Sequence, residues 1–376
     1  MTYARTRLWL GMTSVGGWVV LSLAGIIWNW GAVFQGLAEQ YHELIGLAAF
    51  FGAYLLITFI PDLLGGWVLP NKYERRVPPF GQWLGKWLRA SLIHASYLLL
   101  AAYLLLVVGK TLGTWAAVAL MVVHMLFMTR MQYELARLIA PLFERGELKE
   151  KIGLKFPGMR FVFVDAPDPG FTGGIAGGLR RETILVPNHW QESTKGEMLD
   201  VLKARRVGAI LSGSRTRGVL LAILWNALLF TLAILLSPEG VATVNGVVTT
   251  SFYFTLFSFL GILGFLPELS RRAVFEVDHW VAGKGIEKTK LQEVFSFTDK
   301  LQDDEPVRKR IVEFIFHPIP SVESRIQQLF MNKPSQGAWH VARHSLFLSW
   351  AGIGLLSRAV HCNVGRPELW VFLPCD

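Results

Sequence analysis

Residues 44–68 read LIGLAAFFGAYLLITFIPDLLGGWV, an apolar run with one charged side chain, that of Asp62. A helix of about 20 apolar residues crosses the hydrocarbon core of a bilayer, so this run is long enough to span a membrane. Similar runs occur near 12–34, 90–108, 112–130, 218–236 and 250–267. The sequence therefore predicts a polytopic membrane protein, mainly α-helical, with about six transmembrane helices. The shorter run at 345–357 is a candidate for a seventh.

The composition also favours a membrane protein. Of the 376 residues, 52% are hydrophobic and 17% are charged, whereas a soluble domain carries about 25% charged residues. The net charge is +9, and the basic loops all fall on the side of the N-terminus. Because short loops rich in Lys and Arg stay in the cytoplasm, we expect the N-terminus and segments 131–217 and 268–344 there, and the spans in a bacterial inner membrane. This charge suits an anionic lipid leaflet, and no nucleic-acid-binding module is expected.

Apolar and polar stretches alternate in a way that predicts five parts. They are a four-span membrane region at 1–131, the first half of a small α+β domain at 132–217, a transmembrane hairpin at 218–267, the second half of that domain at 268–335, and an apolar segment with a tail at 336–376. Within the small domain we expect helices at 132–150, 194–212, 268–290 and 321–331, a strand at 161–165, a glycine-rich turn at 172–178 and a second strand at 183–187.

The two cysteines, Cys362 and Cys375, both lie in the tail. If 345–357 crosses the membrane, the tail is outside, where a disulfide is chemically allowed. If it does not cross, both side chains stay thiols. The sequence leaves the two alternatives open.

Four stretches occur in chain order and carry a resemblance to a known family. They are Pro169–Gly174 with Ile184–Val186, the predicted helix at 197–210, Ser270–Asp278, and His317–Leu329. The last keeps a His-Pro pair, an Arg-Ile pair and a Leu. Together they resemble the integral-membrane zinc metallopeptidases of the CAAX prenyl protease and HtpX type. The resemblance covers roughly 130–330 and implies a metallopeptidase-like cytoplasmic domain in which 183–187 is an edge strand; the family activity is that of a zinc metalloendopeptidase.

The resemblance also implies where a metal centre would stand. In such enzymes two His residues at i and i+4 of one helix bind zinc, and the Glu between them is the general base. A Glu from a later helix is the third ligand, and an Asp four residues beyond it orients a ligand. Carried onto this sequence, the first His is Ala204, the base is Arg205, the second His is Gly208, and the third ligand is Val274. The orienting residue is kept as Asp278.

Those replacements predict a degenerate zinc site and no enzyme activity. Ala, Gly and Val offer no side-chain donor atom, and two unit charges about 4 Å apart repel by about 4 kcal/mol at an effective dielectric of 20, so Arg205 and Arg206 would oppose a cation. We expect no catalytic residue, no metal and no cofactor. The expected role is that of a pseudoprotease: a scaffold, adaptor or accessory subunit that binds other membrane proteins through a retained groove. Candidate residues for binding a peptide or an anion are Arg205, Arg206, Thr183, Ile184, Leu185 and Val186.

Two alternatives keep a metal or a cofactor. A membrane zinc metalloendopeptidase with a relocated site would use some of His279, His317, His340 and His344, the last two of which have i, i+4 spacing. A haem-carrying subunit, or one with another cofactor, would use His94 and His124, which fall inside predicted spans. The competing interpretation of the latter pair is a neutral imidazole hydrogen-bonded between helices.

Overall fold

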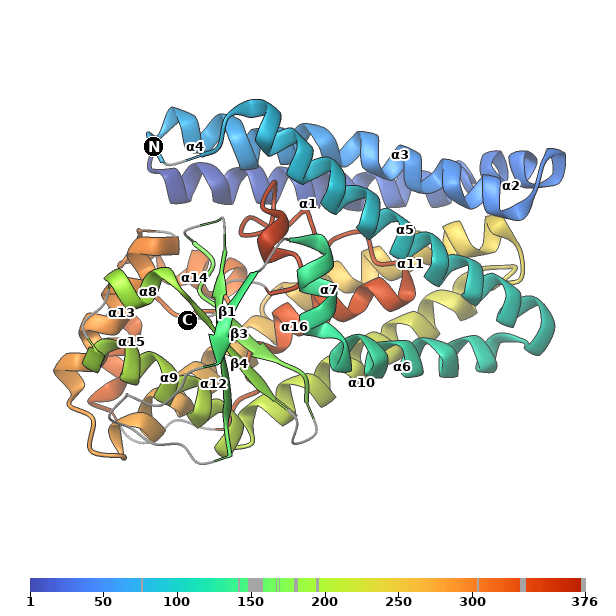
Figure 1. Ribbon diagram of the computed structural model, residues 1–376. Coiled ribbons are helices and arrows are strands. Elements are labelled where there is room, and N and C mark those ends of the chain that lie inside the picture. The colour runs from blue at the N-terminus through green and yellow to red at the C-terminus, as the bar shows by residue number, and fades with distance from the viewer. Residues whose placement is uncertain are drawn as a thin grey trace. The chain divides into compact units, whose positions relative to one another are not determined.

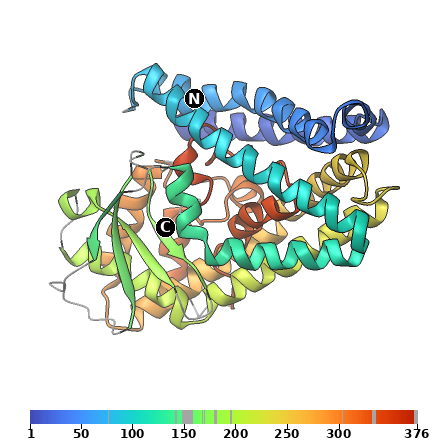
Figure 2. The same cartoon turned by 45° about the vertical axis from the view of Figure 1, so that its right-hand side comes forward.

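The structure is a computed structural model. It describes residues 1–75, 77–140, 143–147, 158–166, 168, 170–178, 182–193, 196–302, 304–331 and 336–372. The chain divides into two compact units (Figures 1 and 2). Unit 1 comprises Met1–Met128, Ile223–Leu260 and Ser345–Trp370, and unit 2 comprises Thr129–Ala222, Gly261–His344 and Val371–Asp376. The five-part division expected from the sequence stays a prediction.

Long apolar helices confirm the predicted fold class, a mainly α-helical polytopic membrane protein. Among the described residues, five helices are long and apolar enough to cross a membrane. They are α1 (Tyr3–Ile27), α3 (Glu43–Leu63) continued through a π-helical turn (Leu64–Val68) and α4 (Leu69–Lys72), α5 (Phe80–Leu112), α10 (Ser214–Leu236) and α11 (Val244–Ile262). A sixth candidate is the pair α6 (Thr114–Arg130) and α7 (Gln132–Ile139), which bends by 74° between the two helices. The short helix α2 (Gly31–Gln40) connects α1 to α3.

The apolar run at 345–357 is not among the candidate spans of the described chain. It begins within α16 (Val341–Leu348), which has 8 residues and is therefore about 12 Å long at 1.5 Å per residue. A 3₁₀ turn at Ser349–Gly352 follows, and later another at Pro367–Leu369. The possible disulfide stays a prediction, because Cys375 lies outside the described residues.

Irregular backbone within unit 1 finds its hydrogen-bond partners on the helices. The segment 345–370, red in Figure 2, is buried along most of its length. Arg7 of α1 donates to the carbonyl oxygens of His361 and Val364 at 2.7 and 3.1 Å, and Ser251 of α11 donates to that of Ile353 at 2.8 Å. Non-helical backbone at membrane depth is tolerated only where protein or water satisfies it, so these contacts stabilise the segment.

Asp62 is the main anchor of that segment. Its carboxylate accepts from the backbone N–H of Gly365 at 2.6 Å, from the indole of Trp87 at 2.9 Å, and from the guanidinium of Arg358. Arg358 also donates to Ser91 at 3.0 Å. Asp62 and Arg358 are both buried, so the charge that interrupts the second apolar run is neutralised inside unit 1.

Unit 2 contains a four-stranded sheet in the order β1-β2-β4-β3 (Figure 1). The strands are β1 (Phe143–Glu147), β2 (Arg160–Asp165), β3 (Gly174–Ala176) and β4 (Thr183–Pro187). β2 and β4 are parallel, and the two outer strands are antiparallel to their neighbours. The strand expected at 161–165 is confirmed as β2. The helix expected at 132–150 is wrong in its second half, because α7 ends at Ile139 and 143–147 pair with β2 as β1.

The expectation that 183–187 is an edge strand is wrong. β4 pairs with β2 on one side and with β3 on the other. The glycine-rich stretch, whose residues 174–176 form β3, makes the second pairing possible: Gly173 has φ +75°, and a Cβ there would lie 2.2 Å from the carbonyl oxygen of Leu185. Since only glycine tolerates both conditions, Gly173 lets the chain enter β3 at the place where β4 later packs against it. A peptide therefore cannot add to β4 as a neighbouring strand.

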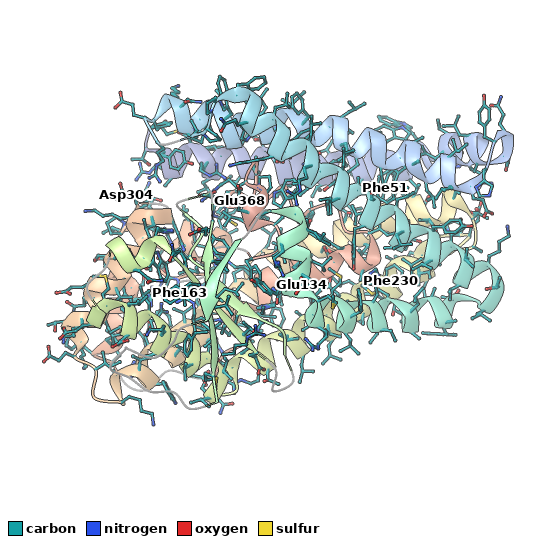
Figure 3. The ribbon with its side chains drawn as sticks, viewed as in Figure 1. Phe51, Glu134, Phe163, Phe230, Asp304 and Glu368 are labelled. Atoms are coloured by element: carbon teal, nitrogen blue, oxygen red, sulfur yellow. The ribbon has the colours of Figure 1, made fainter. Side chains whose placement is uncertain are left out.

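Helices cover the sheet of unit 2 and complete its core. They are α8 (His189–Ser193), α9 (Gly196–Leu211), α12 (Phe265–Ala282), α13 (Lys288–Gln302), α14 (Arg310–Phe316) and α15 (Val322–Leu329). Phe163 of β2, labelled in Figure 3, belongs to an apolar cluster that also includes Ile184, Val201, Val277 and Leu291. The side chains that concern function lie in and beside this cluster.

Candidate functional site

Helices α9 and α12 bring together the positions that the resemblance assigns to a metal centre. Ala204 on α9 and Val274 on α12 are buried members of one apolar cluster. Arg205 and Asp278, on the same two helices, are buried beside it, with 0% and 2% of their side chains exposed. The regular helical spacing of 204, 205 and 208, and of 274 and 278, places these side chains at one helix–helix contact.

Asp278 is held between two guanidinium groups. Arg205 Nε donates to Oδ1 at 2.9 Å. Arg325 of α15 donates to both oxygens, through Nη2 to Oδ1 at 2.8 Å and through Nε to Oδ2 at 2.9 Å. All three side chains are at most 3% exposed. The group therefore links α9, α12 and α15 through charge-assisted hydrogen bonds, and the pair between Arg325 and Asp278 is bidentate.

Aromatic rings lie against the two guanidinium groups. The guanidinium carbon of Arg325 is 3.5 Å from the ring centroid of Phe295, and that of Arg205 is 5.5 Å from the same ring. The ring centroid of Trp339 is 6.0 Å from the guanidinium carbon of Arg205. A cation within about 6 Å of an aromatic centroid is attracted to the ring, so these contacts favour the charged groups at this buried position.

Arg206 is directed away from this group, toward the sheet side of α9. It donates to the carbonyl oxygen of Leu202 at 2.9 Å and to that of Thr172 in the glycine-rich turn. Its guanidinium carbon is 5.1 Å from the ring centroid of Trp190. In the structure the two arginines expected to bind an external anion have partners within the chain: Asp278 for Arg205, and two carbonyl groups for Arg206. An external carboxylate or phosphate at these residues stays a prediction.

Gly208 lies directly against an indole ring. A Cβ atom at this position would be 2.7 Å from Cε3 of Trp280. A side chain at 208 therefore requires Trp280 to move, because the interior is close-packed. Trp280 fills the space into which a larger residue at 208 would project.

The side chains at these positions do not fit a zinc ion. Zinc in proteins is bound by Cys, His, Asp or Glu, whereas Ala204, Gly208 and Val274 carry no donor atom. Arg205 is a cation already paired with the acid nearby. Within the described ranges, no group of three or more His, Cys, Asp and Glu side chains is arranged to hold a metal ion.

The four histidines that a relocated zinc site would use lie in different environments. His279 Nε2 is 2.8 Å from the carbonyl oxygen of Gln328, and His344 Nδ1 is 2.9 Å from that of His340. His317 and His340 are buried. A zinc site assembled from these residues stays a prediction.

The two histidines of the membrane helices each have an aromatic neighbour. His94 of α5 is fully buried, with its ring centroid 4.3 Å from that of Trp350. His124 of α6 contacts Tyr97, whose hydroxyl is hydrogen-bonded to Nε2. For His124 this is the interhelical hydrogen bond of the competing interpretation, and haem ligation by the pair stays a prediction.

Sequence reasoning missed the partners that define this site. Arg325 stands within the fourth family-like stretch, where its charge was a usable signal: a kept Asp278 without zinc ligands needs a cation nearby. Phe295 and Trp280 on helices, and Trp339 in the turn before α16, carry no such signal, because aromatic residues are usually interpreted as ordinary core. Lys203 was also unnoticed; it pairs with Asp200 at 3.0 Å, and burial lowers the pKa of its ammonium group.

Comparison with known proteins gives the fold and not the family. No family model matches the chain, and no curated protein does so. The crystal structure of S. mikatae Ste24p is similar with a TM-score of 0.65, covering 82% of each chain at 14% sequence identity. The chain therefore has a Ste24-like fold, and its long apolar helices indicate an integral membrane protein.

Proposed function

We propose that this protein is a catalytically inactive relative of the membrane zinc metalloproteases, a pseudoprotease that serves as a scaffold, adaptor or accessory subunit of a membrane protein complex. The spans would lie in a bacterial inner membrane, with the N-terminus in the cytoplasm. The observation that carries the proposal is the ion-pair group formed by Arg205, Asp278 and Arg325. It stands where the resemblance assigns a metal centre.

The energetics of that group support a structural role. A buried carboxylate with one partner removed costs about 3–5 kcal/mol, so the three side chains depend on one another. A divalent ion at this position would face Arg205 and compete with both guanidinium groups for Asp278. At this contact the helices are joined by ion pairs in which Arg205 occupies the position of the general base, while Asp278 and Arg325 are kept from the family pattern.

The structural features that the chain keeps are compatible with a binding role. The fold retains its sheet, the α9–α12 contact and the α15 helix that begins at the N-cap Ser321. Strand addition to β4 is not part of the proposal, because both its edges are occupied. Partners would be other membrane proteins, recognised through surfaces of the chain.

The test measures metal and proteolysis together. The purified protein, in detergent or nanodiscs, is analysed for bound zinc by elemental analysis before and after chelation, and for cleavage of an unfolded substrate and a prenylated peptide. An active membrane zinc metalloprotease assayed in parallel is the positive control. We expect substoichiometric zinc and no cleavage. Stoichiometric zinc whose removal abolishes cleavage would overturn the proposal.

A second experiment tests the alternative of an active protease with a relocated zinc site. His279, His317, His340 and His344 are each replaced by Ala, and zinc content and cleavage are measured again. We expect no change in either for any of the four variants. A variant that loses both metal and activity would identify a relocated site.

A further inference from the structure

Helix α14 presents its apolar side chains outward. Ile311 is 68% exposed and Phe314 is 49% exposed, and Val307, in the bend before the helix, is 60% exposed. The acidic Glu313 of the same helix points inward: it is 7% exposed and accepts a hydrogen bond from the hydroxyl of Ser324 at 3.2 Å. A helix that faces water has the opposite arrangement, with polar residues outside. We call Ile311 and Phe314, together with Val307 just before the helix, the apolar face of α14.

This face adjoins the end of a candidate membrane span. Helix α11 ends at Ile262, and a Cβ at Gly264, two residues later, would lie 3.2 Å from the ring of Phe314. The flanking residues Leu263 and Phe265 are 36% and 53% exposed. The apolar surface thus continues from the point where the chain leaves the span onto α14.

A buried arginine fixes α14 in this position. Arg271 Nη1 donates to the carbonyl oxygens of Glu313 and Phe314 at 3.0 and 2.9 Å, and its guanidinium carbon lies 5.0 Å from the ring centroid of Phe314. Because Arg271 is on α12, whose first residue is Phe265, the outward face of α14 is held beside the membrane end of α12.

Basic side chains border the apolar face. Lys309 and Arg310 are both exposed, and no acidic partner of either occurs among the described residues. Arg272 is exposed as well, although Glu268 pairs with it at 2.8 Å, and Asp304 in the preceding loop is an exposed acid (Figure 3). Lys and Arg next to an apolar helix face are the pattern of an interfacial helix on an anionic membrane.

We propose that the apolar face of α14 inserts into the headgroup region of the bilayer that α11 crosses, with Lys309 and Arg310 on anionic phospholipid. Three observations favour lipid over a protein partner: the outward direction of Ile311 and Phe314, the continuity with the end of α11, and the basic border. Unit 2 would then be fixed to the membrane surface by this helix as well as by its connections to the spans. This inference does not depend on whether the protein is an enzyme.

The experiment measures the depth of single spin labels. In a background with Cys362→Ser and Cys375→Ser, nitroxide labels are attached to Val307→Cys, Ile311→Cys and, as a control, Glu287→Cys, and the full chain is placed in nanodiscs with phosphatidylglycerol. Glu287 lies beyond the far end of α12, which has 18 residues and is therefore about 27 Å long at 1.5 Å per residue. Collision with oxygen reports lipid, and collision with a water-soluble nickel chelate reports water.

We expect labels at 307 and 311 to collide several-fold more with oxygen than with nickel, and the label at 287 to show the reverse. The double variant Lys309→Glu/Arg310→Glu should reduce the immersion of the label at 311 in phosphatidylglycerol discs, whereas Lys300→Glu, an exposed site on α13, should leave it unchanged. Labels at 307 and 311 that both collide with nickel as freely as the one at 287 would overturn the proposal. So would labels sheltered from both reagents, a result that indicates a protein partner or a second copy.

Discussion

Arg325 and Asp278 form a bidentate ion pair, with Nη2 to Oδ1 at 2.8 Å and Nε to Oδ2 at 2.9 Å. The residues are 47 positions apart in sequence and lie on α15 and α12. Arg205 of α9 adds a third contact to Oδ1. Three helices of unit 2 therefore depend on a single carboxylate.

Replacing Asp278 by Ala should destabilise unit 2 strongly, because it leaves two buried guanidinium groups without their anion. The expected loss is about 3–5 kcal/mol, as for other broken buried ion pairs. Thermal unfolding of the protein in detergent measures it. Glu293→Ala, at an exposed acid on α13 of unit 2, is the control and should change the melting temperature little. Equal melting temperatures for the two variants would contradict the structural role.

Replacing Arg205 by Met should cost less than replacing Arg325 by Met. Asp278 keeps the bidentate partner in the first variant and only a single hydrogen bond in the second. A double-mutant cycle with Asp278→Asn measures the two coupling energies, which in one buried network reach about 0.5–3 kcal/mol. The order of the two energies is the prediction; a larger coupling for Arg205 would contradict it.

Replacing Gly208 by Ala should destabilise the α9–α12 contact. The added methyl group would lie 2.7 Å from the Trp280 ring, and overpacking of this kind costs about 1–3 kcal/mol. Chemical or thermal unfolding measures the loss, and adding Trp280→Leu should recover part of it. Gly196→Ala is a matched control on the same helix, where a Cβ meets nothing within 4 Å.

Replacing Asp62 by Ala should loosen the segment 345–370 of unit 1. Arg358 then remains buried without its carboxylate, and the N–H of Gly365 loses its acceptor. Amide hydrogen exchange of the full chain should rise most for 353–366, while α10 and α11 change less. Unchanged exchange in that segment would show that Asp62 does not hold it.

The stability of unit 2 should fall as the solution is acidified through the ordinary pKa of histidine. Burial, together with the charge of Arg215, lowers the pKa of His344 well below its ordinary value of 6.5; His340 and Arg343 lower it further, and the hydrogen bond to the His340 carbonyl opposes them. The unfolded chain therefore takes up a proton near pH 6.5 that the folded chain does not, so stability is lost below that pH. His344→Asn should flatten the dependence of melting temperature on pH between about 7 and 5.

The sequence predicts the parts of this protein whose signals are local. The apolar run at 44–68, the strand at 161–165 and the helix after Ser321 each follow from their own residues, and each occurs in the structure. The strand at 143–147 could not be predicted in this way, because Glu and Arg at spaced positions suggest a helix until the partner β2 is known. β4 was interpreted as an edge strand for a related reason: its pairing with β3 shows only in the folded chain.

The candidate site divides in the same way. The absence of donor atoms at Ala204, Gly208 and Val274 is visible in the sequence. The pairing of Asp278 with Arg325 is visible only once α12 and α15 are placed in space. Likewise, Asp62 was recognised as an unusual charge, but its partner Arg358 is 296 positions away, beyond the reach of any local pattern.

The contacts of Arg7 have a consequence for how the protein is made. This side chain, near the start of the first helix, binds the carbonyl groups of His361 and Val364, 354 and 357 positions further along. Chains are synthesised from the N-terminus at about 5–20 residues per second, so α1 enters the membrane long before these carbonyl groups exist. Until residues past 360 leave the ribosome, the acceptor available to Arg7 is the Gly65 carbonyl, 2.6 Å from Nη1, and unit 1 cannot complete its contacts before then.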